Sequence, residues 1–146
     1  MQNKLILIFS LFLFAGCKNA SEGENSLDHI SAEKSPELKE SISRGAGIYN
    51  NFCASCHLAG GEGIAGVFPP LKDSDWLTEK REASIHAVKY GLKGPIKVNG
   101  EKYDNLMPAL GLENGEIADV FNYINNSWGN NVEKPVTKEE VAAIEK

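Results

Sequence analysis

The feature that most constrains this chain is the run CASCH at residues 53–57, where two cysteines three residues apart are followed at once by a histidine. Thiols at this spacing lie on one side of a single helical turn, so each can form a thioether with one vinyl group of a haem. His57 then lies beneath the ring with its imidazole directed at the iron. The motif therefore predicts one haem c, bound covalently through Cys53 and Cys56. Burial of this large apolar ring also gives order to a small domain whose own core is limited.

Two other uses of paired cysteines fit the surrounding sequence less well. A thioredoxin-like site requires a strand before the motif and a βαβ context, whereas here an amphipathic helical pattern precedes it and a glycine-rich stretch follows. A structural zinc site requires four ligands, and only His29 or His86 is available to join Cys53, Cys56 and His57. Haem attachment is therefore the favoured interpretation.

Residues 1–16 have the pattern of an export signal. Lys4 is their only charged residue, and the apolar and small residues that follow it extend without a break to Ala15. This run is too short to span a bilayer as a helix, but it matches the apolar core of a signal peptide. It ends in LFAGC at residues 13–17, which resembles the lipobox of bacterial lipoproteins. That resemblance implies lipidation of Cys17 and a membrane anchor there, and the alternative is an ordinary secretory signal followed by an incidental cysteine.

Changes in composition divide the rest of the chain. Residues 17–36 are polar and aperiodic, which predicts a flexible tether in which His29 is solvated. Residues 37–130 are predicted to form the haem-binding domain, and residues 131–146 a C-terminal extension with a short helix. The net charge is −5 and no basic patch is visible, which argues against a nucleic-acid partner.

The folded part is predicted to be all-α, with three to four helices around one haem and a small β-hairpin before the distal iron ligand. Apolar residues recur at three- and four-residue steps in each predicted helix. The Asn-Gly pair between two short strands favours a type I′ turn. The predicted elements are helices over 38–52, 78–90 (capped by Thr78 and stopped by Gly91) and 113–126, a hairpin over 96–103, and a capping box from Thr137 to Glu140.

The occupant of the sixth coordination position of the iron decides what such a haem can do. After Met1 the chain has one methionine, Met107, and Pro108 follows it, which stiffens the loop and removes a donor. A thioether ligand favours ferrous iron relative to a second imidazole and raises the reduction potential. We expect Met107 to be the distal ligand. The alternatives are that Met107 only fills the core, or that His86 binds the iron in its place.

Residues 43–128 resemble a class I c-type cytochrome, a family with one haem per domain. The resemblance implies His57 as the proximal ligand and Met107 as the distal ligand. It also implies that the Pro69 carbonyl accepts a hydrogen bond from His57 Nδ1–H, with the neighbouring Pro70 as the alternative acceptor. Such a contact fixes the orientation of the imidazole and tunes the iron. The matching motifs are Gly45-x-x-x-Tyr49, CASCH, Pro69-x-Leu71, Met107-Pro108 and a final helix carrying Tyr123.

The resemblance has further implications for packing around the haem. In this family the first and last helices cross beside the ring, and the candidates for that crossing here are Gly45, Tyr49, Phe121 and Tyr123. Two tryptophans remain. Trp76 can bond a haem propionate through its indole N–H or serve packing alone. Trp128 is expected in the core or as an anchoring aromatic.

The segment from Tyr90 to Met107 also resembles c-type domains that serve quinoprotein dehydrogenases, copper nitrite reductases and terminal oxidases. Three function classes were compared: an electron carrier, a haem peroxidase and a gas-binding protein. The last two require an open sixth position, which a methionine ligand fills. We therefore predict an electron-transfer protein and not an enzyme. It would act outside the cytoplasm on the periplasmic side or cell surface, with redox proteins as donors and acceptors, as a monomer or as a subunit of a larger complex.

Overall fold

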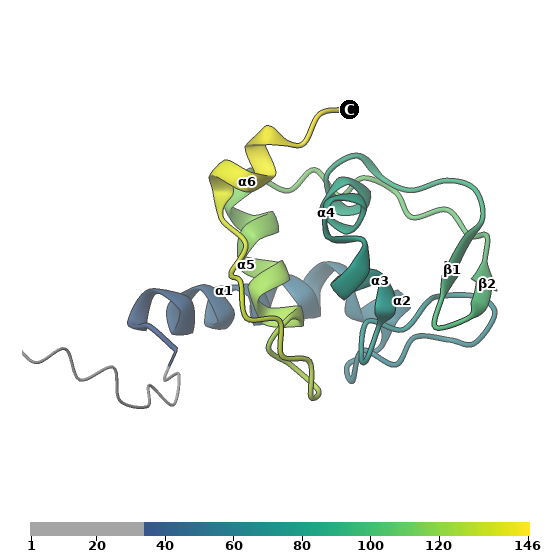
Figure 1. Cartoon of the computed structure of the whole chain (residues 1–146), viewed down its shortest axis with the longest axis horizontal. Helices are drawn as coiled ribbons and strands as arrows, with labels where there is room; N and C mark the ends of the chain where they lie inside the picture. The colour runs from purple at the N-terminus through teal and green to yellow at the C-terminus, as the bar shows by residue number, and fades with distance from the viewer. Residues whose placement is uncertain (1–33) are drawn as a thin grey trace, which may run out of the picture. The chain divides into compact units, whose positions relative to one another are not determined.

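The computed structural model describes residues 34–146, so the expected signal, Cys17 and most of the expected tether lie outside the described residues. The described part is mainly helical and includes one two-stranded antiparallel sheet (Figure 1). The cytochrome-like fold class predicted from the sequence is confirmed in its helical content and its small hairpin. The elements are α1 (Pro36–Phe52), α2 (Ala54–His57), α3 (Asp75–Glu79), α4 (Arg81–Tyr90), β1 (Ile96–Val98), β2 (Glu101–Tyr103), α5 (Asn114–Ile124) and α6 (Lys138–Ala143).

The first helix, α1, begins two residues before the predicted start at residue 38. The Ser35 side chain accepts a hydrogen bond from Leu38 N at 3.2 Å, and Pro36 takes the first helical position. A proline is tolerated there because its missing N–H would have no partner within the helix. The helix ends at Phe52, and Cys53 caps it while also starting α2. The haem-binding motif is thus continuous with the longest helix.

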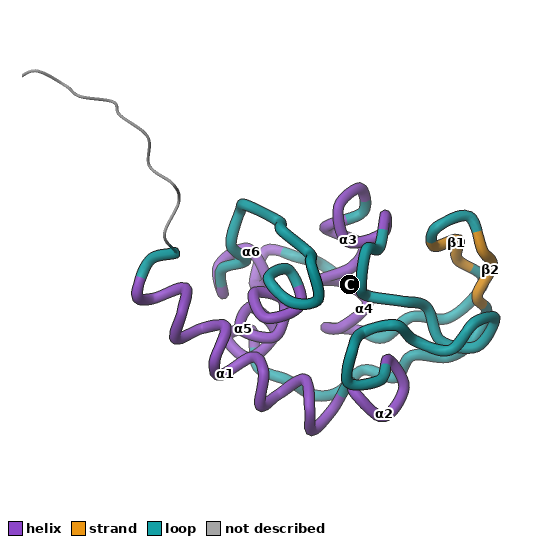
Figure 2. Tube along the Cα trace, turned by 90° about the horizontal axis from the view of Figure 1, so that it is seen from below, coloured by secondary structure: helices purple, strands orange, loops and turns teal. Residues whose placement is uncertain are grey.

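The α1 and α5 helices cross at close range, as the resemblance implied (Figure 2). Gly45 makes this approach possible, because a Cβ on it would overlap the backbone carbonyl of Asp119 and meet the Cβ of Tyr123. At the same crossing, Arg44 makes two hydrogen bonds to the Asp119 carboxylate, at 2.6 and 2.9 Å, and Ser41 donates a third at 2.7 Å. Shape and charge therefore both fix the register of the two helices.

The predicted second helix over 78–90 is wrong at its start, since the structure has two helices separated by a break at Lys80. The backbone of Lys80 is not helical, with φ −124° and ψ 42°. Thr78 lies inside α3, where its hydroxyl donates to the Asp75 carbonyl and caps nothing. The two pieces are anchored to different neighbours, because Asp75 is bonded to the hairpin and Arg81 to the C-terminal segment. The end at Tyr90, before Gly91 at φ 85°, is as predicted.

The hairpin forms as predicted from its Asn-Gly pair. Asn99 and Gly100 both have positive φ, at 49° and 85°, as a type I′ turn requires. Strand β1 pairs with β2 so that Val98 lies opposite Glu101, and Val98 is buried. The turn is tied to the start of α3, since Asn99 N and Asp75 N each donate to the other residue's side chain, at 2.8 and 2.9 Å. The hairpin is therefore fixed to the helical part of the domain.

Helix α5 ends at Ile124, two residues before the predicted end. The C-terminal segment that follows is held to α5 by hydrogen bonds. The side chain of Asn122 bonds both the N–H and the carbonyl of Val136. Thr137 caps α6 by accepting from Glu140 N at 3.2 Å, as its half of the predicted capping box requires. The Glu140 carboxylate binds Arg81, and a hydrogen bond with the Thr137 backbone also helps to lower its pKa. The apolar side chains that this segment buries are Val136, Val141 and Ile144.

The hydrophobic core lies between α1, α3, α4, α5 and the C-terminal segment. Tyr49, Ile85, Ile117 and Val120 have essentially no exposed surface. No helix within residues 34–146 combines the length and the apolar character needed to cross a bilayer.

Candidate functional site

The CASCH motif occupies the junction of α1 and α2. Cys53 is buried and Cys56 half-buried, and neither is in a disulfide. Cys53 ends α1 with helical φ and ψ, and Cys56 N donates to its carbonyl at 3.1 Å. Burial raises the pKa of the Cys53 thiol to about 11, with the nearby Cys56 as a smaller cause. The two sulfurs therefore belong to one helical turn, as thioether attachment to a ring requires.

Two adjoining cavities border this turn and share part of their lining. The first also includes the exposed end of the motif, and the second extends inward between α3, α4 and α5. Apart from the motif itself, the walls are almost wholly aliphatic, aromatic or proline side chains. A flat apolar macrocycle attached at Cys53 and Cys56 would enter both, so the residues present fit a haem. The residues shared by the two cavities are Cys53, His57, Pro69, Leu92, Ile96 and Met107.

One hydrogen bond, made through the ring atom Nδ1, holds the His57 imidazole in place. Nδ1 lies 2.9 Å from the Pro69 carbonyl oxygen, and Pro70 is not the partner. A carbonyl can only accept, so Nδ1 carries the hydrogen and Nε2 keeps a lone pair. Burial lowers the pKa of His57, and the bond to Pro69 opposes that shift. Burial thus favours the neutral imidazole and the bond to Pro69 orients it, and a neutral, oriented imidazole is the form that binds a metal.

Met107 is held at the same cavities by the loop after the hairpin. Its N–H and carbonyl both bond to the backbone of Leu92, at 2.9 and 2.8 Å, as an isolated antiparallel bridge. Gly91 has φ 85°, and a Cβ there would press on the Met107 carbonyl. Met107 is half-buried and lines both cavities together with His57. The fold therefore brings together the two residues that the sequence predicted as axial ligands.

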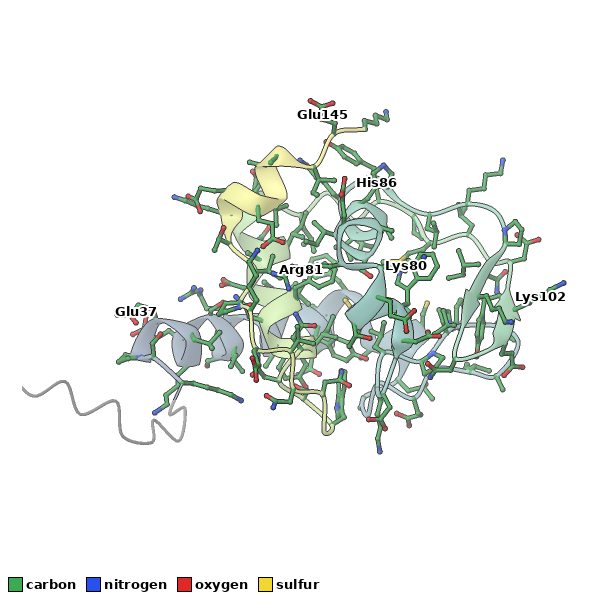
Figure 3. All side chains as sticks on the ribbon, viewed as in Figure 1. Glu37, Lys80, Arg81, His86, Lys102 and Glu145 are labelled. Atoms are coloured by element: carbon green, nitrogen blue, oxygen red, sulfur yellow. The ribbon has the colours of Figure 1, made fainter. Side chains whose placement is uncertain are left out.

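The other candidate residues lie at different places. Trp76 is half-buried and lines the second cavity, beside Leu77. His86 lines neither cavity, because it faces away on α4, where its ring packs 5.1 Å from that of Tyr90. Figure 3 shows His86 on the side of α4 toward Glu145, and Lys102 projecting outward from the hairpin. Within the described residues, the His, Cys, Asp and Glu side chains form no group of three or more that could hold a metal ion.

Two aromatic residues named from the sequence for packing also make hydrogen bonds that the sequence did not indicate. The Tyr49 hydroxyl donates to the Leu58 carbonyl at 2.7 Å, and the Trp128 indole N–H donates to the Ala59 carbonyl at 3.1 Å. Both bonds tie down the turn after His57. Gly61 allows this packing, since a Cβ on it would overlap the Trp128 ring. The glycines at 60, 61 and 63 were the only signal in the sequence that this turn is crowded.

These aromatic residues form one cluster beside the α1–α5 crossing. The rings of Tyr49, Tyr123 and Trp128 lie 5.0 to 5.5 Å apart, in tilted and edge-to-face arrangements that aromatic pairs prefer. Trp128 has φ 55° and lies beyond the end of α5, so it reaches back over the turn after His57. The cluster connects α5 to the turn that follows His57.

Comparison with known proteins agrees with this geometry. The family model described as "Cytochrome c" matches residues 42–128, which span the motif, both cavities and the α1–α5 crossing. The chain belongs to the cytochrome c family. Cytochrome c-552 of Thermus thermophilus is 42% identical to the chain over 109 residues, covering 68% of the chain and 82% of that protein.

Two further relatives are larger proteins. The gluconate 2-dehydrogenase cytochrome c subunit of Pantoea cypripedii is 33% identical over 106 residues, covering 70% of the chain and 24% of that protein. The Cbb3-type cytochrome c oxidase subunit CcoP of Rhodobacter capsulatus is 34% identical over 84 residues, covering 55% of the chain and 28% of that protein. Relatives of this cytochrome thus include subunits of dehydrogenases and oxidases.

Family membership gives the cofactor and the type of activity. The chain is an electron carrier and not an enzyme, and its haem c is attached covalently through the cysteines of the CASCH motif, Cys53 and Cys56. It also implies a location outside the cytoplasm. The apolar cavity walls are consistent with that cofactor, because they would bury the ring beside Cys53 and His57.

Proposed function

We propose that this cytochrome passes single electrons between redox proteins of a respiratory chain, with His57 and Met107 as the axial ligands of its haem. The observation that carries the proposal is that these two residues line the same two cavities. The peroxidase and gas-binding alternatives require an open sixth position. A methionine held by two backbone hydrogen bonds at that place argues against both.

The roles of the surrounding residues follow from their contacts. When bound, the haem supplies an iron that changes between ferric and ferrous states. Pro69 keeps the hydrogen on Nδ1 of His57, so Nε2 is free to bind the metal in both states. The bridge between Leu92 and Met107 holds the thioether on its loop. The apolar walls exclude water, and a soft ligand in a dry site raises the reduction potential.

Three finer assignments belong to the same proposal. Trp76 contributes its indole N–H to a haem propionate, which its place in the second cavity allows. Cys17 carries the lipid anchor, and the polar residues between Cys17 and α1 form the tether that lets the haem-binding domain reach its partners. Cys17 and nearly all of the tether lie outside the described residues, so the lipobox resemblance and the polar composition support these assignments.

A fixed position within a larger enzyme is the alternative form of the same function. It is favoured by the relatives that are cytochrome subunits of a dehydrogenase and an oxidase, since their cytochrome regions resemble this chain. Extraction with mild detergent followed by size-exclusion chromatography separates the two. A carrier elutes alone, whereas a subunit elutes with its enzyme.

Absorption spectroscopy of the haem-loaded protein tests the ligation. We expect a low-spin ferrous spectrum that carbon monoxide does not change, and a weak long-wavelength sulfur-to-iron band in the ferric form. Met107→Leu should lose that band and bind carbon monoxide. His86→Gln is the matched control and should change neither. A high-spin ferric spectrum of the unaltered protein, or the same change in His86→Gln, would overturn the proposal.

A further inference from the structure

Three hydrogen bonds join the hairpin turn to the residues at the start of α3. Asn99 N donates to the Asp75 carboxylate at 2.8 Å, and Asp75 N donates to the side-chain oxygen of Asn99 at 2.9 Å. The side-chain nitrogen of Asn99 donates to the Asp73 carbonyl at 3.1 Å. We call these three bonds the hairpin latch. A type I′ turn requires only positive φ, which glycine adopts without any side chain, so the turn alone does not explain the latch.

The latch is the hairpin's polar attachment to the rest of the domain. Across residues 34–146, no other residue from Ile96 to Tyr103 is hydrogen-bonded to a part of the chain outside the hairpin. The other attachment is apolar, since Val98 and Tyr103 are almost fully buried. A two-stranded hairpin is marginally stable by itself in water, so its position depends on these two attachments.

The ribbon that ends in this turn also carries Met107. Ile96 pairs with Tyr103 inside the hairpin, and farther from the turn Leu92 and Met107 exchange two backbone hydrogen bonds. Three residues on each strand separate the two pairings, so they share one register. The latched turn therefore lies at one end of an antiparallel ribbon, and Met107 lies near the other end.

The latch also joins two parts of the wall of the second cavity. Val98, the residue before Asn99, lines that cavity from the hairpin. Trp76, the residue after Asp75, lines it from the start of α3. The bonds between Asn99 and Asp75 therefore fix the separation of these two parts of the wall. Ile96, on the same strand as Val98, lines both cavities.

We propose that Asn99 is a positioning residue for Met107 and acts on it through the ribbon. This inference rests on the proposed ligation by His57 and Met107, and adds the residue that keeps the thioether at the iron. The closed latch fixes the ribbon to α3, so the loop with Met107 cannot swing away from the cavities. Without the latch, residues 101–107 would keep one described hydrogen bond outside the ribbon, from the Asn105 amide to the Val67 carbonyl at 3.1 Å.

The first test measures how fast imidazole replaces Met107 in the ferric, full-length, haem-loaded protein. Imidazole binds only after the thioether has left, so at high imidazole concentration the rate reports the release of Met107. Asn99→Gly keeps the positive φ of the turn and removes both side-chain bonds, and we expect it to speed imidazole binding about tenfold. The sulfur-to-iron band should also fade at a lower temperature.

The matched control is the same substitution at another asparagine. Asn131 is exposed and makes no hydrogen bond within the described residues. Asn131→Gly should therefore bind imidazole within about twofold of the unaltered rate, because it breaks no contact. If Asn99 served the turn alone, Asn99→Gly would bind imidazole at the same rate as Asn131→Gly. Equal rates for the two variants would overturn the inference.

The second test changes the other half of the latch. Asp75→Ala removes the acceptor of the Asn99 N–H, whereas Asp75→Asn keeps an oxygen that can accept and removes only the charge. We expect Asp75→Ala to match Asn99→Gly, and Asp75→Asn to stay within about twofold of the unaltered protein. In the double variant Asn99→Gly/Asp75→Ala, the effect should be smaller than the product of the single effects, because both break one contact. An effect equal to that product would overturn the inference.

Two further outcomes separate the possible failures. Glu140→Gln weakens a contact with Arg81 on another part of α4, and it should leave the imidazole rate unchanged. A rate raised as much as in Asn99→Gly would show a general loss of stability and overturn the inference. If the unaltered ferric protein lacks the sulfur-to-iron band, the ligation proposal fails and the inference falls with it. If the band is present but Asn99→Gly changes neither the rate nor the temperature at which the band fades, the inference alone fails.

Discussion

Two regions of this cytochrome are held together in different ways. The scaffold, formed by α1, α5 and α6, is fixed by side chains that reach across long stretches of sequence, such as Arg44 to Asp119 and Asn122 to Val136. The cavity loops, residues 58–71 and 91–112, make many backbone hydrogen bonds of their own and few side-chain bonds to the rest of the domain, such as those of Tyr49, Trp128 and Asn99, and they face the space that the haem would fill. The difference implies that the scaffold supports itself, whereas the loops depend on the cofactor.

Loss of the haem should produce the largest difference between the scaffold and the cavity loops. In Cys53→Ser/Cys56→Ser, made without haem, we expect residues 58–71 and 91–112 to lose protection against hydrogen exchange entirely, because the apolar cavity walls lose their partner. Protection in α1 and α5 should fall but remain measurable. Hydrogen exchange with mass spectrometry checks this. Equal loss of protection in both regions would show that the scaffold does not support itself.

Gly45→Ala tests the scaffold at its closest contact. A Cβ at this position meets the backbone of Asp119, which cannot move aside without separating α1 from α5. We expect a loss of about 3 kcal/mol in the free energy of unfolding, or failure to fold. Gly47→Ala is the control, because a Cβ there meets nothing within 4 Å. It should stabilise the helix by about 0.5–1 kcal/mol, as measured by urea unfolding.

Tyr49→Phe tests one connection between the two regions. The variant keeps the ring contacts with Tyr123 and Trp128 but removes the hydrogen bond to the Leu58 carbonyl. We expect a loss of about 1 kcal/mol in stability, with faster hydrogen exchange confined to the turn after His57. Tyr123→Phe in the same cluster is the comparison. If exchange rises equally across α1, the bond serves the helix and not the turn.

The smallest expected effect concerns the bidentate pair between Arg81 and Glu140, at 2.6 and 2.9 Å. The hydrogen bond from Arg81 is the main cause that lowers the pKa of Glu140. The pair therefore stabilises the fold above the unfolded pKa of about 4.3, and this contribution is lost as the pH falls through the lower folded value. Glu140→Gln should cost about 1 kcal/mol or less at pH 7, and the cost should shrink as the pH falls through the folded pKa of Glu140.

Thermal unfolding from pH 7 to pH 3 checks the prediction. Glu139→Gln is the matched control, because Glu139 is exposed and contacts only Lys138 at 3.8 Å. It should have little effect at either pH. A constant difference between Glu140→Gln and the unaltered protein from pH 7 to pH 3 would show that the carboxylate charge does not contribute.

The parts of the fold that the sequence predicted are those with strong local signals. The Asn-Gly pair determines its turn by the φ values it tolerates, and Gly91 ends α4 for the same reason. The helical periodicity before CASCH reflects burial along a single face of α1. Each of these features depends on residues near one another in the chain, so a short stretch of sequence contains the information.

The features of the fold that the sequence did not predict depend on residues far apart in the chain. The break at Lys80 follows from anchoring α3 to Asn99 and α4 to the C-terminal segment, and no local pattern shows either contact. The sequence indicates Glu140 as a member of a capping box, but it does not show that the main partner of its carboxylate is Arg81, far along the chain. At the site, the motifs indicated His57 and Met107, whereas the support that Trp128 gives from beyond the end of α5 was visible only in the fold.

Placing Cys53 at the end of α1 has one more consequence. The proximal histidine lies on the turn that continues the scaffold, while Met107 is carried by a loop that the scaffold does not contain. With His57 and Met107 both bound to one iron, as proposed, the metal would connect the scaffold to the cavity loops. The absorption spectrum of the haem would then change when the two regions separate. Gentle heating would release the loop side first, so the sulfur-to-iron band would fade before the helices melt. The absorption of the haem would therefore measure the stability of the cavity loops separately from that of the helices.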